Sequence, residues 1–299
     1  MDRYKNRSDS NIITRKYFDS ILLEMRHIDA VIPDTKLKLF GECFDTPVMM
    51  AALSHLDSVH SGGMEEMAKG AYAANAVMWA GMGDEDELKR ITSTGAKTIK
   101  IIKPYADKSV ILNRIRFAES VGCIAVGMDV DHAFGHTGQY DIVLGLKMIR
   151  QSLDDIKEYV QATSLPFIIK GVLSVQDALK CLEAGVQGIV VSHHHGIMDY
   201  AVPPLMILPE IVSHVKGKMK IFLDCGVESG MDVFKALALG ADAVSVGRAI
   251  MQPLSEHGAG GVCDTVKRIT EQLAGAMART CSPDIYSIDK SVIRHPLSF

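Results

Sequence analysis

Short apolar runs alternate with longer amphipathic segments along most of the chain from residue 47 onward. The short runs have the composition of buried strands, and the longer segments repeat apolar residues at helical spacing. The predicted strands are residues 47–53, 76–81, 96–103, 123–130, 166–172, 188–193, 220–226 and 243–249. The helix predicted after each strand covers, in the same order, residues 64–75, 84–94, 108–122, 152–164, 174–185, 203–217, 229–240 and 261–278. Eight such units in series predict a (β/α)8 TIM barrel.

The same pattern predicts one domain, because no Ser/Gly-rich linker or low-complexity run interrupts the series. Residues 1–46 form an N-terminal extension, residues 47–281 form the barrel and residues 282–299 form a C-terminal tail. We expect the extension to cover the bottom of the barrel or to pack on a helix.

The composition is that of an ordinary globular protein, with 47% hydrophobic residues, 23% charged residues and a net charge of −4. This balance gives no electrostatic reason to expect binding to nucleic acid or to an anionic membrane surface, so the predicted partners are small molecules. The N-terminus has no apolar signal segment, and no run is long enough to span a membrane, which favours the cytoplasm. The six cysteines lie far apart, without the spacing of a disulfide framework or a zinc site.

The active site of a TIM barrel lies at the carboxyl ends of its strands, so polar residues there are the candidates. Lys170 lies within an apolar run, where burial is costly unless an anion or an electron-rich ring faces it. A salt bridge inside the barrel is the alternative explanation. Asp224 ends another run and either binds ligand hydroxyls or caps the turn that follows.

The last two predicted strands are followed by glycines and an arginine, at residues 226–230 and 246–249. TIM barrels frequently hold a phosphate at this position. Glycine lets the backbone approach an anion, and the guanidinium of Arg248 matches a phosphate with two parallel hydrogen bonds.

Three consecutive histidines, His193, His194 and His195, follow the sixth predicted strand. In an extended segment His193 and His195 point one way and His194 the other, so two of them could bind one metal ion but not all three. The ligands that could complete a metal site are Asp129, Asp131, His132 and His136. A single histidine acting as a base needs only a ligand within hydrogen-bond reach, and surface exposure explains the others.

Residues 166–262 resemble the C-terminal half of the FMN-dependent 2-hydroxy acid dehydrogenases and oxidases. In that family a strand ending in Lys-Gly, a Ser-Asn-His-Gly-Gly-Arg segment, an Asp-Gly-Gly turn and a run ending in Gly-Arg follow one another. Here FIIKGV, SHHHG, LDCGVESGMDVFKALALGADAVSVGR and GAGGV stand in that order. Upstream, FDSILLEMRHI and FGECFDTPVMMAA resemble the entry segment and first strand more loosely.

The resemblance implies an FMN cofactor and assigns roles to individual residues. Lys170 resembles the lysine beside flavin N1 and the C2 carbonyl, and His194 resembles the base that takes the substrate proton. The implied cofactor-binding residues are Lys170, Ser192, Asp224, Gly226, Gly247 and Arg248. The family also implies a homo-oligomer, specifically a tetramer.

Three positions depart from the family pattern. Ile197 stands where the family has the arginine that binds the substrate carboxylate, and Glu228 stands where an arginine usually lies near the phosphate. Lys103 stands near the place of a tyrosine in the third strand and is a candidate for the missing anion contact. We therefore predict that Lys103 and Asp129 contact the substrate.

The sequence thus favours an FMN-dependent oxidoreductase that acts on a small 2-hydroxy acid or a related hydroxy compound. In that reaction His194 removes a proton while a hydride equivalent passes to flavin N5, and no metal is needed. Three alternatives remain open. They are an FMN-dependent isomerase resembling type 2 isopentenyl diphosphate isomerase, a metal-dependent hydrolase using His193 and His195, and a barrel that binds a phosphorylated metabolite without redox chemistry.

Overall fold

The computed structural model describes residues 5–295, and its centre is an eight-stranded parallel barrel. The strands are β4 (Val48–Met50), β5 (Met78–Ala80), β6 (Thr98–Ile102), β7 (Ala125–Asp129), β10 (Phe167–Val172), β11 (Gly188–Val191), β12 (Lys220–Leu223) and β13 (Ala243–Val246). They pair in the order β4-β13-β12-β11-β10-β7-β6-β5, and a parallel bridge between Leu53 and Ala80 closes the ring. The TIM-barrel prediction and all eight predicted strands are confirmed.

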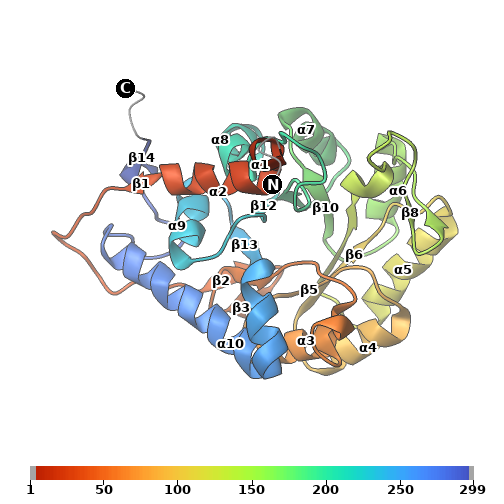
Figure 1. The fold of residues 1–299 in the computed structure, drawn as a ribbon, viewed down its shortest axis with the longest axis horizontal. Helices are drawn as coiled ribbons and strands as arrows, with labels where there is room; N and C mark the ends of the chain where they lie inside the picture. The colour runs from red at the N-terminus through yellow and green to blue at the C-terminus, as the bar shows by residue number, and fades with distance from the viewer. Residues whose placement is uncertain (1–4, 296–299) are drawn as a thin grey trace.

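Helices surround the barrel, one after each strand (Figure 1). They are α3 (Gly63–Ala73), α4 (Glu85–Ser93), α5 (Lys108–Ser120), α6 (Leu153–Gln161), α7 (Val175–Glu183), α8 (Pro204–Val215), α9 (Gly230–Ala238) and α10 (Arg248–Ala278). Reciprocal side-chain and backbone hydrogen bonds fix the starts of α6 and α9, where Ser152 pairs with Asp155 and Ser229 with Asp232.

Helix α10 starts at Arg248, whereas the pattern predicts a start at residue 261. Pro253 and the glycines at 258, 260 and 261 hide the periodicity of its first turns. Gly258 has a φ of 53° and a ψ of −135°, and the helix bends there. The prediction of the helix start is therefore wrong by roughly three and a half turns.

The N-terminal extension covers both ends of the barrel. The antiparallel hairpin of β2 (Leu37–Leu39) and β3 (Glu42–Phe44) leads directly into the start of β4, and so lies at the barrel bottom. Helix α1 (Lys5–Ser8) is followed by α2 (Ser10–Ser20), which contacts α8 and the segments that follow β11 and β12. The expectation that the extension covers the barrel bottom therefore applies to the hairpin. Helix α2 lies instead at the carboxyl ends of the strands.

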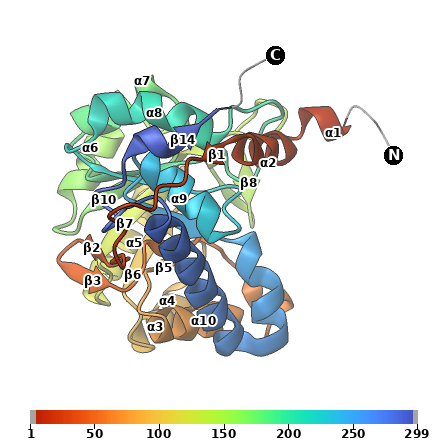
Figure 2. The same ribbon diagram turned by 90° about the vertical axis from the view of Figure 1, so that its left-hand side faces the viewer.

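Strand β1 (Leu22–Leu23), which follows α2, lies beside the C-terminal strand β14 (Ile293–Arg294) (Figures 1 and 2). The two strands pair antiparallel, and β14 follows the short helix η3 (Lys290–Val292). The remaining elements follow the ends of β4 and β7. They are η1 (Leu56–Ser58), η2 (Val130–Ala133) and the hairpin of β8 (Ile142–Val143) and β9 (Leu146–Lys147).

The core fills the barrel and the layer between strands and helices. Trp79 and Phe222 meet edge to face with ring centroids 5.5 Å apart, and both are buried. Nearly every strand position is apolar and buried, as expected for a parallel sheet covered on both faces. All six cysteines are free thiols. Within residues 5–295, none of the helices combines the length and apolar character needed to cross a bilayer.

Candidate active site

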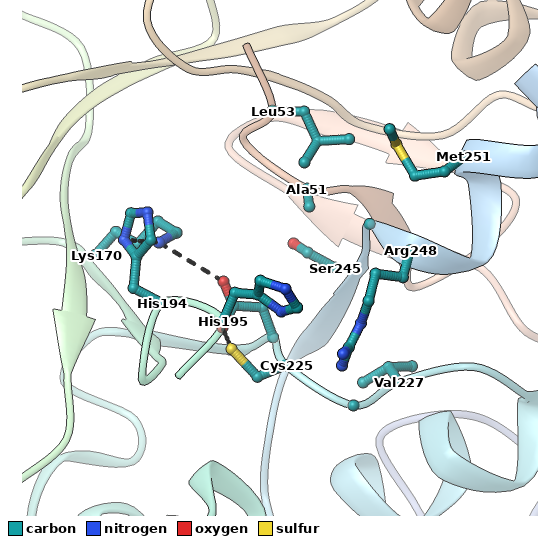
Figure 3. A pocket seen from close by; sticks show the side chains of 13 residues that line it. Ala51, Leu53, Lys170, His194, His195, Cys225, Val227, Ser245, Arg248 and Met251 are labelled. Atoms are coloured by element: carbon teal, nitrogen blue, oxygen red, sulfur yellow. Dashed lines mark hydrogen bonds and ion pairs between the residues drawn. The ribbon is translucent and has the colours of Figure 1, made fainter. Parts of the chain in front are cut away.

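A cavity of about 270 Å³ opens at the carboxyl ends of the strands (Figure 3). Its lining residues are Ala51, Leu53, Lys170, His194, His195, Asp224, Cys225, Gly226, Val227, Ser245, Gly247, Arg248 and Met251. Of the six residues predicted to bind the cofactor, five line this cavity, and Ser192 lies just behind it. Lys170 and His194 stand on one side, and Arg248 and Val227 stand on the other.

Lys170 projects from β10 and is 6% exposed. Its Nζ atom lies 3.2 Å from Oδ1 of Asp129 and 3.8 Å from Oδ2 of Asp224. Burial alone lowers the pKa of a lysine, but these carboxylates outweigh it, so the pKa of Lys170 lies above its usual value. The salt bridge considered from the sequence is present, and the ammonium group also lines the cavity.

Asp129 ends β7 between two ammonium groups. Its Oδ2 atom lies 2.7 Å from Nζ of Lys103, and its Oδ1 atom faces Lys170. Burial raises the pKa of a carboxyl group, yet the charges of Lys170 and His194 hold the pKa of Asp129 well below its usual value. Lys103 is therefore already paired, which limits its capacity to bind a substrate anion.

Asp131, in η2, is the second carboxylate of the site. Its Oδ1 atom lies 2.9 Å from Nδ1 of His194, and its Oδ2 atom is buried without a hydrogen-bond partner among the described residues. Burial and the neighbouring charge of Asp129 raise the pKa of Asp131. The carboxylate packs against Gly171, at an irregularity in β10 between Lys170 and Val172.

The three histidines lie in a turn and not in an extended segment, because His194 and His195 have φ values of 48° and 57°. The alternation assumed from the sequence therefore does not apply. His193 is buried against α2, with Nε2 2.8 Å from Oγ1 of Thr14, and its Nδ1 atom accepts a hydrogen bond from the backbone of Gly196. His195 is exposed at the cavity edge.

His194 is the histidine that points into the charged group. Its Nδ1 atom lies 2.9 Å from Asp131 and 3.2 Å from Asp129. Burial lowers the pKa of a histidine, but the two carboxylates outweigh it and raise the pKa of His194 to about 9. The backbone N–H of His194 donates to Oγ of Ser192, so Ser192 holds the turn in place.

A fourth histidine completes this cluster. Nε2 of His132 lies 2.9 Å from Nε2 of His194, and the two rings meet nearly edge to face. Burial and the charge of His194 lower the pKa of His132 to about 4. His132 is therefore neutral and accepts the Nε2 proton of His194. The sequence presents His132 only as a metal ligand candidate, because no local motif marks a contact across 62 positions.

A metal centre is poorly supported by this geometry. His193 uses both ring nitrogens in contacts within the protein, so it cannot pair with His195 as a ligand. Among residues 5–295, the only group of three or more possible metal ligands with atoms within 4.8 Å of one another is Asp129, His132 and His194. Because two lysine ammonium groups already contact Asp129, a metal cation there would meet positive charge.

The opposite side of the cavity suits an anion. Gly247 and Arg248 begin α10, and no side chain caps the first N–H groups of this helix. Arg15 of α2 was missed from the sequence, and it donates to the carbonyl of Gly226 and to both carboxylate oxygens of Asp232. Glu228 is exposed beside this turn.

Comparisons with known proteins place these features in a family. A sequence model described as FMN-dependent dehydrogenase matches residues 2–152 and 145–295. The peroxisomal (S)-2-hydroxyacid oxidase GLO3 of Arabidopsis thaliana is 30% identical over 89% of this chain and 83% of its own. The chain belongs to the FMN-dependent dehydrogenase family.

Other members of the family support the same assignment. Glycolate oxidase of Spinacia oleracea is 29% identical over 93% of this chain and 86% of its own. A structure of mandelate oxidase with 3,3-difluoro-2-hydroxy-3-phenylpropionic acid has a TM-score of 0.88 and 27% identity, covering 97% of this chain and 91% of that one. FMN is accordingly the cofactor of this family member.

The cavity fits FMN in its charge pattern. The uncapped start of α10 and Arg248 provide donors for a phosphate, and Lys170 places a buried positive charge on the other side. Cys225 departs from the Asp-Gly-Gly turn of the family and has a φ of 65°, a conformation that favours glycine. The Cys225 thiol donates to Oδ1 of Asp224.

Proposed function

We propose that this FMN-dependent enzyme oxidises a small 2-hydroxy acid or a related hydroxy compound, with His194 as the base. The observation that carries the proposal is the position of His194 in the cavity wall, against two carboxylates and beside Lys170. The FMN supplies the two-electron acceptor. The relatives named above, which oxidise 2-hydroxy acids and glycolate, support this substrate class.

His194 must be in its neutral form to accept the proton of a substrate hydroxyl group. With a pKa of about 9, roughly one side chain in a hundred is neutral at pH 7. The carboxylates of Asp129 and Asp131 orient the ring and stabilise the imidazolium that forms when the proton arrives. They thereby favour proton removal, while limiting the fraction of enzyme that is ready to react near neutral pH.

Lys170 serves the other half of the reaction. Its ammonium group is buried and lines the cavity opposite the phosphate donors. A fixed positive charge of this kind stabilises negative charge that develops on a ring bound there. Salt bridges to Asp129 and Asp224 keep the group charged in spite of its burial.

The substrate is bound without the arginine that grips a carboxylate in the family. Ile197, half-buried, offers no charge, and Lys103 is paired with Asp129. We therefore infer that a neutral relative of a 2-hydroxy acid, such as a hydroxy amide or ester, competes well with the acid itself.

Anaerobic reduction of the FMN-loaded enzyme tests this function. Bleaching of the flavin band is followed with matched pairs of 2-hydroxy acids and their amides and methyl esters. At least one matched pair of compounds is expected to bleach the flavin band of the wild type. The His194→Ala variant is expected to retain FMN but to show no bleaching. Absence of bleaching by every compound, with FMN bound stoichiometrically, overturns the proposal.

We also propose a cytoplasmic homo-oligomer, from the composition and from the family resemblance. Two relatives bear names that place them in peroxisomes, so the location needs its own test. Cell fractionation and sedimentation velocity of the purified protein are the measurements. A membrane-associated protein contradicts the cytoplasmic location, and a monomeric protein contradicts the homo-oligomer.

A further inference from the structure

The imidazole pair continues outward beyond His132. Nδ1 of His132 lies 3.4 Å from Oδ2 of Asp141, which precedes the β8–β9 hairpin. The side chains along the line Asp129, His194, His132 and Asp141 are 5%, 24%, 22% and 29% exposed. Asp129 is thus buried in the barrel, and the other three side chains are partly exposed at its mouth.

Asp141 is held in the orientation that this line requires. Its Oδ1 atom accepts a hydrogen bond from the backbone of Ile142, which leaves Oδ2 for His132. Its backbone N–H donates to the carbonyl of Ala133, and its carbonyl accepts from Met148. One backbone group therefore holds the carboxylate, and two others hold the backbone of Asp141.

The protonation of each ring follows from its partners. His132 accepts at Nε2, so its own proton lies on Nδ1 and faces the carboxylate of Asp141. Other charged groups face the pair from three strands or their ends, namely Asp129 and Asp131 after β7, Lys170 on β10 and Lys103 after β6. These groups keep the positive charge on His194 and off His132.

We propose that His132 and Asp141 form the path by which His194 releases its proton to solvent. This inference rests on the proposed function, in which His194 acquires a proton at each turnover. The Nε2 proton of His194 moves to Nε2 of His132 while the Nδ1 proton of His132 moves to Asp141 and then to water. His132 then regains its starting tautomer by taking a proton from water at Nδ1 and losing one to water from Nε2, with no net proton change. No electrons move, and His194 regains the lone pair that it needs as a base.

Concerted movement makes this path accessible. The repulsion that disfavours a proton on His132 comes partly from the charge of His194, and that charge disappears as the proton leaves. Asp141 removes a proton from the far nitrogen at the same time, so His132 never needs to hold a full charge beside a charged His194. In this role His132 is a positioning and relay residue that acts through His194.

The first test observes the hydrogen bond itself in the FMN-loaded enzyme labelled with ¹⁵N-histidine. A scalar coupling between the two Nε2 atoms is expected in the wild type and in Asp141→Asn, and is absent in His132→Gln. A missing coupling in the folded wild type shows that the rings do not share a proton and overturns the proposal.

The second test measures how fast the His194 imidazolium proton exchanges with water, with no substrate present. His132→Gln keeps a hydrogen-bond acceptor but cannot pass a proton, so exchange is expected to slow at least tenfold and to recover with added imidazole. Asp141→Asn is expected to slow exchange several-fold. His136→Gln, an exposed histidine on the same segment, is the matched control and is expected to match the wild type.

Exchange that is unchanged or faster in His132→Gln shows that His132 only covers His194, and this overturns the relay. Because the test needs no substrate, it is independent of the proposed oxidation. If the proton exchanges as expected but no hydroxy compound bleaches the flavin, the relay is retained and the proposed function is rejected. If a hydroxy compound bleaches the flavin but exchange does not depend on His132, only the relay is rejected.

Discussion

The carboxylate of Asp131 rests directly on the α-carbon of Gly171. A Cβ atom at residue 171 would lie 2.5 Å from Cγ of Asp131, and Gly171 has a φ of 93°. The irregularity in β10 therefore leaves room for the second carboxylate beside His194. No side chain larger than a hydrogen atom allows the same arrangement.

Gly171→Ala is expected to displace Asp131 and to lower the pKa of His194. Gly122→Ala is the matched control, because Gly122 has a φ of 80° with nothing within 4 Å of its added Cβ. Backbone strain at a positive φ predicts that the control loses about 1–2 kcal/mol of folding free energy. The clash of the added Cβ atom with Asp131 predicts that Gly171→Ala loses roughly 1–3 kcal/mol more folding free energy than the control. Urea unfolding and a ¹⁵N titration of His194 measure both effects, and equal losses with an unchanged titration contradict the prediction.

The rate of flavin reduction is expected to rise with pH toward a pKa of about 9, because only neutral His194 accepts a proton. Asp131→Asn removes a charge that stabilises the imidazolium, so the pKa of His194 falls. The increase in the rate of flavin reduction is then expected at lower pH. Stopped-flow bleaching between pH 6 and 10 measures the profile. A profile of the same midpoint in the variant shows that Asp131 does not hold the charge of His194.

The raised pKa of His194 also predicts how folding stability depends on pH. Since the folded-state value of about 9 exceeds the ordinary value of 6.5, this contribution is fully present below pH 6.5 and is lost as pH rises to 9. In His194→Gln, the fall in stability across this window is expected to be smaller than in the wild type. Denaturant melts at several pH values test this, and parallel curves for both proteins contradict it.

Ile197→Arg is expected to improve the binding of 2-hydroxy acids. A hydrogen bond to a charged group contributes about 1.5–3 kcal/mol, or roughly a 10- to 100-fold change in affinity. Ile197→Gln adds polarity without charge and serves as the control. The concentration of acid that gives half-maximal bleaching is the measurement. An equal gain for the amides, or no gain for the acids, shows that residue 197 does not face the carboxylate.

Arg248→Met is expected to weaken FMN binding by roughly one to two decades, by loss of a charge-assisted contact at the start of α10. Glu228→Gln removes an exposed negative charge near this turn and is expected to strengthen binding more modestly. Fluorescence titration of the flavin-free protein gives both dissociation constants. Added salt should reduce the difference between Glu228→Gln and the wild type, and a difference that persists at high salt has another origin.

The sequence predicts all eight barrel strands because each is a short apolar run between helix signals. It predicts Lys170 and Arg248 at the cavity because strand ends in this fold converge on one face. It does not predict the turn at His194 and His195, since left-handed conformations at histidine leave no signature in the pattern. The contact of His132 with His194 is missed because it joins two loops far apart in the chain.

The place of α2 is hidden from the pattern for a related reason. Its amphipathic face fits any apolar surface, so periodicity cannot say which end of the barrel it covers. Individual polar contacts, such as Thr14 with His193 and Arg15 with Asp232, determine at which end of the barrel α2 lies. The four-residue spacing of Ser10, Thr14 and Phe18 is the available signal, because it places two polar residues on the same helix face as Phe18.

The pairing of β1 with β14 has a consequence for the order of events during synthesis. Helix α2 lies one residue before β1, and the partner strand at residues 293–294 follows all eight barrel strands in the chain. The barrel strands can therefore pair on the ribosome while α2, which holds His193 through Thr14, still lacks its anchor. The turn that carries His194 is therefore expected to become ordered only after β1 and β14 have paired, so the catalytic base is placed late in folding.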